Sequence, residues 1–588
     1  MNAAVILIVG IVILALGYVF YGGWLSKQWG IDPSRPTPAH ELEDGMDYCP
    51  AKAPVLMGHH FSSIAGAGPI NGPIQAAVFG WVPVLLWVLI GGIFFGGVHD
   101  FGALLASVRH KGQSIGEVIA VNMNGRAKKL FNIFAYLTLL LVVAAFASIV
   151  ASTFCTVAPS DVISAEMAAA QTESHAVVAM ISILFIVLAV IFGLLVYRRN
   201  APLGISSVIG VIAIIICLVI GLNFHPVELS YNTWMIICGI YIAIASVTPV
   251  WILLQPRDYL SSFLLYGMMI IAVLGVLGCA IFGDTHANMD IPAFTTGYNA
   301  TYGPIFPALF VTIACGAISG FHSLVSSGTT AKQLDNEKHA KPIAYGGMLI
   351  ECALALVSLC AVGYIWNQYA GGEITVPTTV FATGISQMVG CIPGLGNDTA
   401  ITTVSSLLVL AVSAFCLTSL DTATRLARYM FQEFWLEPGQ SVEDTTGYKK
   451  VLTNKYLATI ITVILGVGLG LTGYAKIWGL FGAANQLLAA LGLLAVATWL
   501  GNIGRNNKMF LFPMGFMLIV TITSLVLTIR SQLMILMGKV TDATGAVVAA
   551  DWGTYAKLIL GALLVILAII LAVEGIQTLI KQHKAKAA

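Results

Sequence analysis

Long apolar stretches make up most of this chain, and short polar or basic segments separate one stretch from the next. A helix needs about 20 apolar residues to cross a bilayer, and windows of that kind occur fifteen times in the 588 residues. They are residues 4–23, 60–79, 82–105, 130–154, 176–196, 204–222, 233–255, 261–282, 304–325, 343–365, 401–422, 455–474, 478–500, 510–529 and 556–579. The pattern therefore predicts an all-α integral membrane protein.

The composition supports this prediction. Hydrophobic residues make up 58% of the chain and charged residues only 9%, whereas soluble domains carry about 25% charged residues. The formal net charge is +1, and no nucleic-acid-binding motif is present. We therefore expect the lipid bilayer to surround the protein, and we expect no nucleic-acid partner.

Basic residues are distributed unevenly between the predicted loops. If the first residue lies outside the cell, 24 of the 28 lysines and arginines fall in or beside cytoplasmic loops. This is the bias that the positive-inside rule describes. The first span has no basic segment before it and has Lys27 just after it, which indicates an anchor rather than a cleaved signal peptide. The predicted topology is N-out and C-in.

Glycine and proline interrupt two of the predicted spans, at residues 58–73 and 245–251. A break removes backbone hydrogen bonds that lipid cannot replace, so a broken membrane helix must be buried in protein or line a cavity. A pair of breaks in two halves of a chain is typical of secondary transporters with a binding site near the bilayer midplane. Ordinary packing kinks are the alternative interpretation.

The interruptions also indicate what binds there. Asn71-Gly72-Pro73 and Thr248-Pro249 have the composition of helix starts, with a capping side chain beside a proline that needs no N–H. Two half-helices that start inside the membrane would direct free N–H groups and positive dipole ends into a shared cavity. We therefore expect a small organic carboxylate or the carboxyl end of a peptide. The predicted substrate-binding residues are Gly66, Ala67, Gly68, Pro69, Asn71, Gly72, Thr248, Pro249, Trp251 and Gln255.

Each interrupted span opens a group of five spans. Because five is odd, the two groups have opposite orientations, which predicts a five-plus-five inverted-repeat core. The predicted regions are an N-terminal anchor helix and cytoplasmic loop (1–56), a first repeat (57–232), a second repeat (233–450) and about four accessory helices (451–588).

Polar side chains within the predicted spans are candidates for ion coupling, because they are expensive in lipid and usually functional. Glu351 falls about nine residues into its span, where burial favours the uncharged carboxyl group. We predict that it takes up a proton during transport, with a hydrogen-bonded structural role as the alternative. Hydroxyls near a broken helix suit a hard cation, so a bound Na+ is the second coupling hypothesis and helix packing its alternative. These hydroxyl residues are Ser319, Ser323, Ser326 and Thr329.

Charged and imidazole side chains also gather at the predicted cytoplasmic ends of several spans. They would form a polar collar that opens and closes an inner vestibule, or each would simply reach interfacial water. Asp421 and Arg425 lie one helical turn apart, as an ion pair requires. The predicted inner gate comprises His59, His60, His99, Asp100, Arg257, Asp258, His322, Asp421 and Arg425.

The ten cysteines lie mostly in apolar spans, and no CxxC pair or zinc-type spacing occurs. Buried cysteine behaves as a small hydrophobe, so structural filling is favoured over disulfide or metal chemistry. We predict no metal site and no cofactor beyond the sodium hypothesis. An intramembrane metalloenzyme built on His59, His60, His99 and Asp100 is disfavoured because the chain has no HExxH pair. A sensor subunit is disfavoured because the 430–455 loop is too short for a signalling domain.

Several motifs together resemble a known family over most of residues 40–500. They are GHHF (58–61), AGAGP (65–69), GVHDF (97–101), SIGE (114–117), LQPRDYL (254–260), ISGFHS (318–323), SSGT (326–329), YGGM (345–348), SLDTATR (419–425) and FGAANQLL (481–488). The sequence resembles the carbon starvation protein A (CstA) family and its pyruvate-transporting relatives.

The resemblance implies a multi-pass transporter of the bacterial inner membrane that takes up pyruvate or peptides during nutrient limitation. It also implies the amino acid–polyamine–organocation superfamily, whose core is a five-plus-five inverted repeat. We therefore predict a cation-coupled symporter for a small carboxylate such as pyruvate, with the proton favoured over sodium. Uptake of di- or tripeptides is the alternative.

Overall fold

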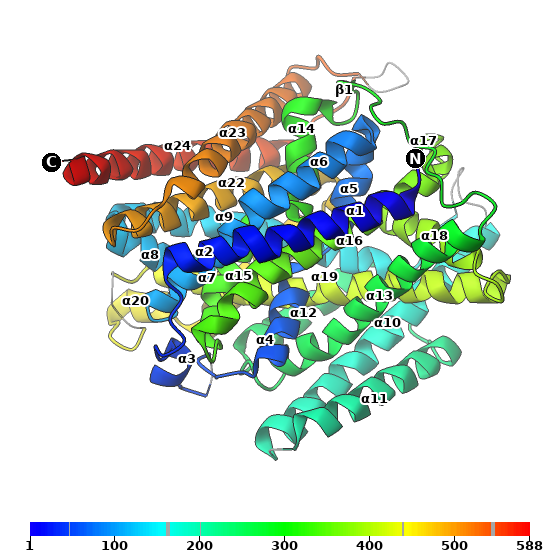
Figure 1. The fold of residues 1–588 in the computed structure, drawn as a ribbon, viewed down its shortest axis with the longest axis horizontal. Helices are drawn as coiled ribbons and strands as arrows, with labels where there is room; N and C mark the ends of the chain where they lie inside the picture. The colour runs from blue at the N-terminus through cyan, green and yellow to red at the C-terminus, as the bar shows by residue number, and fades with distance from the viewer. Residues whose placement is uncertain are drawn as a thin grey trace.

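The structure is a computed structural model, and it describes the chain except for residues 46, 160–164, 200, 375, 438–439, 441, 542–546 and 588. The described part is a bundle of helices (Figure 1), with one short antiparallel hairpin of β1 (Tyr298–Asn299) and β2 (Gly303–Pro304). Twelve of its helical segments are long and apolar enough to cross a membrane. The fold is therefore that of an all-α integral membrane protein, as the sequence predicts.

The helices divide between two stretches of the chain. Up to residue 282 they are α1 (Ala3–Leu16), η1 (Gly17–Tyr21), α2 (Gly22–Trp29), α3 (Pro38–Glu41), α4 (Ala53–Ile64), α5 (Gly68–Ala76), η2 (Ala77–Phe79), α6 (Trp81–Gly91), η3 (Gly92–Gly96), α7 (Gly97–Arg109), α8 (Ile115–Asn122), α9 (Gly125–Phe154), α10 (Ala165–Gly193), η4 (Leu194–Arg198), α11 (Leu203–Asn223), α12 (Tyr231–Val247) and α13 (Leu254–Phe282). After it they are α14 (Ile305–Ile313), η5 (Ala314–Gly316), α15 (Gly320–Gly328), η6 (Thr330–Lys332), η7 (Glu337–His339), η8 (Lys341–Gly346), α16 (Gly347–Tyr364), α17 (Trp366–Ala370), α18 (Pro377–Gly390), α19 (Asp398–Phe434), α20 (Gly447–Leu452), α21 (Lys455–Gly470), α22 (Tyr474–Asn502), α23 (Lys508–Leu536) and α24 (Trp552–Ala587).

Three of the fifteen predicted spans are shorter in the structure than a full membrane crossing. α12 and α21 are apolar helices of 17 and 16 residues, and the predicted span 60–79 is divided between α4 and α5. α18 has 14 residues and no counterpart among the predicted spans. It packs against α5, α13, α16 and α19.

Loops that were assigned to the same side of the membrane meet in the structure. Asn2 forms a backbone bridge with Asn288, and Cys155 forms one with Leu229, all in segments predicted outside. Ala51 bridges Leu334 between two segments predicted in the cytoplasm. These contacts agree with the predicted alternation of the spans, while the N-out orientation itself stays a prediction.

The first predicted interruption is a helix break. α4 ends at Ile64 and α5 begins at Gly68, and the three residues between them are fully buried. Pro69 occupies the first turn of α5, where no intrahelical partner for its nitrogen is needed. The prediction that Asn71-Gly72-Pro73 starts a helix is wrong, because these residues lie inside α5.

The second predicted interruption does not divide a single span. Residues 248–253 form the connection between α12 and α13, and Thr248, Pro249 and Trp251 are partly exposed there. The second broken helix is instead α14–η5–α15, which is interrupted between Ile313 and Gly320. α5 packs against both α14 and η5. The two breaks that face each other are therefore residues 65–67 and 314–319.

A similar order of elements follows each break. The broken helix α4–α5 is followed by α6–η3–α7, the short α8 and the long α9, whereas α14–α15 is followed by η8–α16, the short α17 and α18, and the long α19. α9 packs along α19, while α12 and α21 pack against each other and against both long helices. α13 packs on α4, and α22 packs on α15. This pattern fits two repeats that end at α13 and α22.

The hairpin of α10 and α11 lies at the edge of the bundle (Figure 1) and interrupts the first of these series. α11 exposes most of its apolar surface, as an inserted lipid-facing helix would. A count of five spans from the first break includes α10 and α11. It therefore places the end of the first series two helices too early. By this order of elements the second series would start after residue 282, whereas the sequence predicts a boundary at 232/233.

Candidate substrate and coupling site

The first break is enclosed by side chains from three other elements. A methyl group added at Gly66 would lie 2.7 Å from the Phe146 ring of α9 and 3.2 Å from the Ser419 hydroxyl of α19. One added at Gly68 would lie 2.6 Å from the Cβ atom of Cys315 in η5. The backbone at residues 65–68 is therefore in direct contact with the second break, and glycine is needed for this approach.

An asparagine on α22 supports the second break. The Asn485 side-chain carbonyl accepts the Phe321 N–H at 2.8 Å, and its amide donates to Ser319 Oγ at 3.0 Å and to Cys315 Sγ at 3.6 Å. These bonds replace part of the hydrogen bonding that an unbroken helix would supply. Asn485 thereby fixes the start of α15 against the break in α4–α5.

A buried cluster of two carboxyl groups and two imidazoles lies beside the second break, and we call it the coupling cluster. Asp100 on α7 contacts His99 Nδ1 at 2.7 Å through one oxygen and His322 Nδ1 at 2.9 Å through the other. His322 Nε2 lies 3.4 Å from Glu351 Oε2. All four side chains are 0% exposed.

The hydrogen bonds of Asp100 determine which nitrogen of His322 carries a proton. Because Asp100 accepts a bond from His322 Nδ1, the neutral ring presents an unprotonated Nε2. That lone pair faces the Glu351 carboxyl group, and no hydrogen bond from the described residues reaches either Glu351 oxygen or His322 Nε2. Two acceptors in contact inside a protein need a cation between them, and a proton on one of them is the simplest.

A second buried group, the Arg257 network, joins α4, α12, α13 and α19. Asp258 contacts His59 Nδ1 at 2.7 Å and Arg257 Nη2 at 2.7 Å through its two oxygens. Arg257 also pairs with Asp421, and the Tyr241 hydroxyl donates to Asp421 at 2.6 Å. Arg257 is 2% exposed, and the two carboxylates and His59 are 0% exposed. The network is therefore paired and sealed from solvent.

A third contact ties the loop before α4 to α19. The Arg425 guanidinium lies 3.2 Å from Asp47 and also donates to the backbone carbonyl of Thr248, while the Tyr429 hydroxyl donates to Asp47 at 2.6 Å. Burial alone would raise the pKa of Asp47, but the positive charges of Lys332 and Arg425 outweigh it and lower this pKa to about 2. Asp47 is therefore ionised at neutral pH and holds the loop in place.

The predicted inner gate is divided between two hydrogen-bonded groups, and two of its nine residues belong to neither. His99, Asp100 and His322 belong to the coupling cluster, whereas His59, Arg257, Asp258 and Asp421 form the Arg257 network. His60 bonds Thr330 at 2.8 Å, and Arg425 binds the loop. All nine residues are buried, so the alternative of interfacial anchoring is wrong for this state.

Three of the four predicted hydroxyl residues hydrogen-bond to nearby protein groups. Ser323 donates to the Gly320 carbonyl at 2.7 Å and Thr329 to the Val325 carbonyl at 2.9 Å, both within their own helical turns. Ser319 bonds Asn485 and Cys315, and only the buried Ser326 hydroxyl lacks a partner among the described residues. A hydroxyl that donates to a carbonyl keeps its oxygen lone pairs, so the sodium hypothesis stays a prediction.

The predicted substrate-binding residues also separate into two sets. Gly66, Ala67, Gly68 and Pro69 lie at the first break, and Asn71 and Gly72 follow in α5. Thr248, Pro249, Trp251 and Gln255 lie around the α12–α13 connection, away from the facing breaks. Gln255 donates to Gln333 at 2.6 Å, and the Gln333 amide reaches His59 Nε2 at 3.3 Å. Gln255 therefore extends the Arg257 network.

Sequence reasoning missed several residues of these sites. Cys315 was assigned to structural filling, and Asn485 was not placed in the site, because neither lies near a glycine–proline break in sequence. Tyr241, Asp47 and Tyr429 complete the buried ion pairs from elements far apart in the chain. Only the polarity of Tyr241 within an apolar span could have signalled its role.

Two facing helix breaks and buried titratable groups inside a bundle of membrane spans define a membrane transporter. The sequence matches the family described as "Carbon starvation protein CstA" over residues 2–372 and 367–524, and the chain belongs to this family. This confirms the resemblance and excludes an enzyme.

Three relatives illustrate the range of the family. The chain is 30% identical to "Peptide transporter CstA" of Bacillus subtilis, with 87% of each chain covered. It is 32% identical to "Peptide transporter CstA" of Campylobacter jejuni, covering 89% of this chain and 79% of that protein. It is 29% identical to "Pyruvate/proton symporter BtsT" of Escherichia coli, covering 84% and 76%.

Proposed function

We propose that this transporter is a proton-coupled symporter of the bacterial inner membrane that takes up a small carboxylate such as pyruvate. The observation that carries this proposal is the buried contact of His322 Nε2 with Glu351 at 3.4 Å, beside the second break. A site that requires one exchangeable cation, next to two broken helices, is what a coupled carrier needs. The pyruvate/proton relative supports the same choice of substrate and ion.

The substrate would bind between the breaks. α5 and α15 both begin there, so the positive ends of their dipoles lie beside the breaks and suit a carboxylate. Phe146, Cys315 and Ser419 lie close around the first break. This tight enclosure favours a cargo of a few heavy atoms.

Protonation would then control the conformational change. The coupling cluster contains side chains from α7, α15 and α16. Its charge state therefore affects how the second broken helix packs. When a proton lies between His322 and Glu351, Glu351 adds no uncompensated negative charge beside Asp100. The helices α7, α15 and α16 can then close around the substrate. Loss of the proton on the cytoplasmic side leaves an unpaired buried charge, which favours opening. The Arg257 network and the Arg425–Asp47 contact would be the parts that separate during inward opening.

Uptake of a short peptide is the second candidate. The CstA relatives at 30–32% identity are named peptide transporters, and the positive helix ends at the breaks would also suit a peptide carboxyl group. Uptake of labelled pyruvate and of labelled dipeptides into proteoliposomes, each challenged with the other unlabelled compound, distinguishes the two. Pyruvate uptake that a hundredfold excess of dipeptide does not reduce supports the first candidate.

The coupling proposal is tested with Glu351→Gln. Glutamine keeps the size of the side chain but cannot release a proton, so we expect accumulation driven by an imposed pH gradient to disappear while exchange of internal and external substrate continues. Glu574→Gln is a matched control, because Glu574 lies on α24, away from the coupling cluster, and contacts the exposed Arg126 at 3.6 Å and Asn124 at 3.3 Å. Unchanged gradient-driven uptake by Glu351→Gln, or uptake driven by sodium alone, contradicts the proposal.

A further inference from the structure

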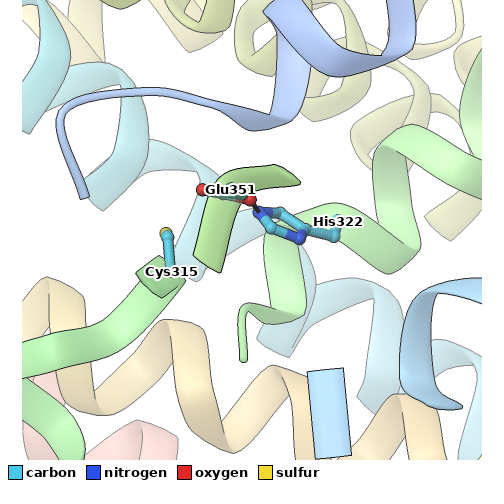
Figure 2. Close-up of side chains that lie close together, drawn as sticks. All are labelled: Cys315, His322 and Glu351. Carbon is cyan, nitrogen blue, oxygen red and sulfur yellow. Dashed lines mark ion pairs between the residues drawn. The ribbon is translucent and has the colours of Figure 1, made fainter. Parts of the chain in front are cut away.

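Three potential metal ligands converge beside the second break. The ligand atoms of Cys315 in η5, His322 in α15 and Glu351 in α16 all lie within 4.8 Å of one another, and the three side chains are buried. Figure 2 shows the His322 ring directed at the Glu351 carboxyl group, with the Cys315 thiol nearby. We infer that these side chains form a binding site for a divalent transition-metal ion of the Zn2+ class.

The spacing of the donors suits such an ion. Two ligands held about 2.0–2.1 Å from tetrahedral Zn2+ lie about 3.3–3.4 Å apart, and His322 Nε2 lies 3.4 Å from Glu351 Oε2. Both of these atoms, and the second Glu351 oxygen, lack a hydrogen-bond partner among the described residues. A cation between them would satisfy groups that the protein itself leaves unsatisfied.

The surroundings of the three ligands also fit a metal site. Asp100 accepts the His322 Nδ1 hydrogen bond at 2.9 Å, the carboxylate–histidine arrangement that orients a metal-binding imidazole. Asn485 directs its amide at Cys315 Sγ at 3.6 Å, and Ser319 lies 3.3 Å from the same sulfur. Both groups can donate hydrogen bonds to a thiolate once the metal has displaced its proton.

The donor set selects the class of ion. Thiolate and imidazole favour Zn2+ and Co2+ over Mg2+ and Ca2+, which prefer oxygen ligands alone. The ligands come from three separate elements, so a bound ion would tie η5 and α15 to α16 and hold the protein closed. Metal binding goes beyond the proposed transport cycle, and it can be observed whether or not that proposal holds.

The binding test uses Co2+ and the full-length protein in detergent. We expect one Co2+ per chain, with the near-ultraviolet absorption of a thiolate–cobalt bond, and displacement by Zn2+ but not by excess Mg2+. Cys315→Ser should abolish that absorption and weaken binding at least tenfold, and Asp100→Asn should weaken it 10–100-fold. Cys360→Ser is the matched control, because Cys360 is also buried but contacts the Ala3 carbonyl instead.

Several outcomes decide this inference. Absence of stoichiometric Co2+ binding overturns it, as does a thiolate–cobalt absorption that survives in Cys315→Ser. Binding that Glu351→Gln leaves unchanged also overturns it. A thermal-unfolding curve for each variant shows whether loss of binding reflects loss of folding; if Cys315→Ser is unfolded, Glu351→Gln alone decides.

A separate pair of cysteines lies on the face of the bundle that carries the N-terminus. Cys279, in the last turn of α13, and Cys391, just after α18, have their sulfur atoms 3.1 Å apart. Cys391 is partly exposed, whereas Cys279 is buried. We infer that this pair is a reversible disulfide site, which the N-out topology places in an oxidising compartment.

The reaction is thiol–disulfide exchange with a disulfide reagent in solution. The Cys391 thiolate attacks that disulfide and releases one thiol; the Cys279 thiolate then attacks the mixed disulfide and releases the second. The two cysteines lose two electrons and two protons to the reagent. The new bond would tie α18, which covers α5, α16 and α19, to α13.

Oxidised glutathione is the reagent for the test. Treated protein should lose two alkylatable thiols, and mass spectrometry should identify a peptide linking Cys279 to Cys391 that dithiothreitol separates. Cys279→Ser should remove the linkage, and Cys360→Ser should keep it. Full alkylation of both cysteines after treatment overturns the inference.

Discussion

Replacing Arg257 with glutamine is expected to lower the free energy of unfolding by about 3–5 kcal/mol and to abolish transport. The guanidinium group is 2% exposed and pairs with both Asp258 and Asp421. Removing it leaves two buried carboxylates without their shared cation, although Asp258 keeps its contact with the His59 imidazole and Asp421 keeps its bond from Tyr241. An uncompensated buried charge is far more costly than a broken surface pair. Thermal unfolding in detergent and uptake into proteoliposomes measure the two effects.

Arg126→Gln is the matched control. Arg126 is also paired with a carboxylate, Glu574 at 3.6 Å, but its side chain is 73% exposed. Surface pairs of this kind contribute about 0–1 kcal/mol, so its unfolding temperature should hardly change. A double variant, Arg257→Gln with Asp421→Asn, should recover part of the stability that Arg257→Gln loses, because one of the bare charges is gone. Equal unfolding temperatures for Arg257→Gln and Arg126→Gln would contradict the role assigned to the network.

The membrane spans could be predicted from sequence because they follow a one-dimensional rule, and the orientation stays a prediction from a rule of the same kind. A helix in lipid must be apolar over a fixed length, and basic residues concentrate on one side. The first break was also predictable, since Gly66, Gly68 and Pro69 together cannot continue a helix without loss of hydrogen bonds. These properties do not require knowledge of what the segment contacts.

The second break could not be identified by the same rule. Residues 314–319 contain no proline, and their interruption is stabilised by Asn485, which lies 170 residues beyond Cys315 in the chain. Thr248-Pro249 carried the local signal instead, because proline marks a turn between helices as readily as a break within one. The inserted α10–α11 hairpin then reinforced the error, since it displaced the expected position of the second repeat.

The sequence predicted which kinds of residue form the site, but it did not predict which of them contact one another. Glu351, His322 and Asp100 were each recognisable as ionisable groups in apolar spans, where such groups are usually functional. Their contacts join α7, α15 and α16, and no local pattern determines which of the ten buried side chains of the predicted gate and Glu351 meet. The family motifs located the same positions without assigning roles to them. Tertiary packing alone separates the coupling cluster from the Arg257 network.

Gly72→Ala is expected to cost about 3 kcal/mol of stability and to reduce uptake at least tenfold. A Cβ atom at residue 72 would lie 2.3 Å from the Ile313 carbonyl oxygen and 2.8 Å from its Cα and carbonyl carbon. These are backbone atoms of the second broken helix, so α5 and α14 must move apart to admit a methyl group. Overpacking that side chains cannot relieve costs about 1–3 kcal/mol, and here the displacement would also separate the two breaks between which the carboxylate is proposed to bind.

Gly267→Ala separates this effect from the general effect of alanine in a helix. Gly267 lies in α13, and a Cβ atom there would have no neighbour within 4 Å, so the substitution should be neutral or stabilise the helix by up to about 1 kcal/mol. Gly17→Ala gives an intermediate case, because its Cβ would meet only the flexible Ile93 side chain at 2.9 Å. If Gly72→Ala unfolds and transports like Gly267→Ala, the two broken helices are not held in contact, and a binding site formed between them has to be abandoned.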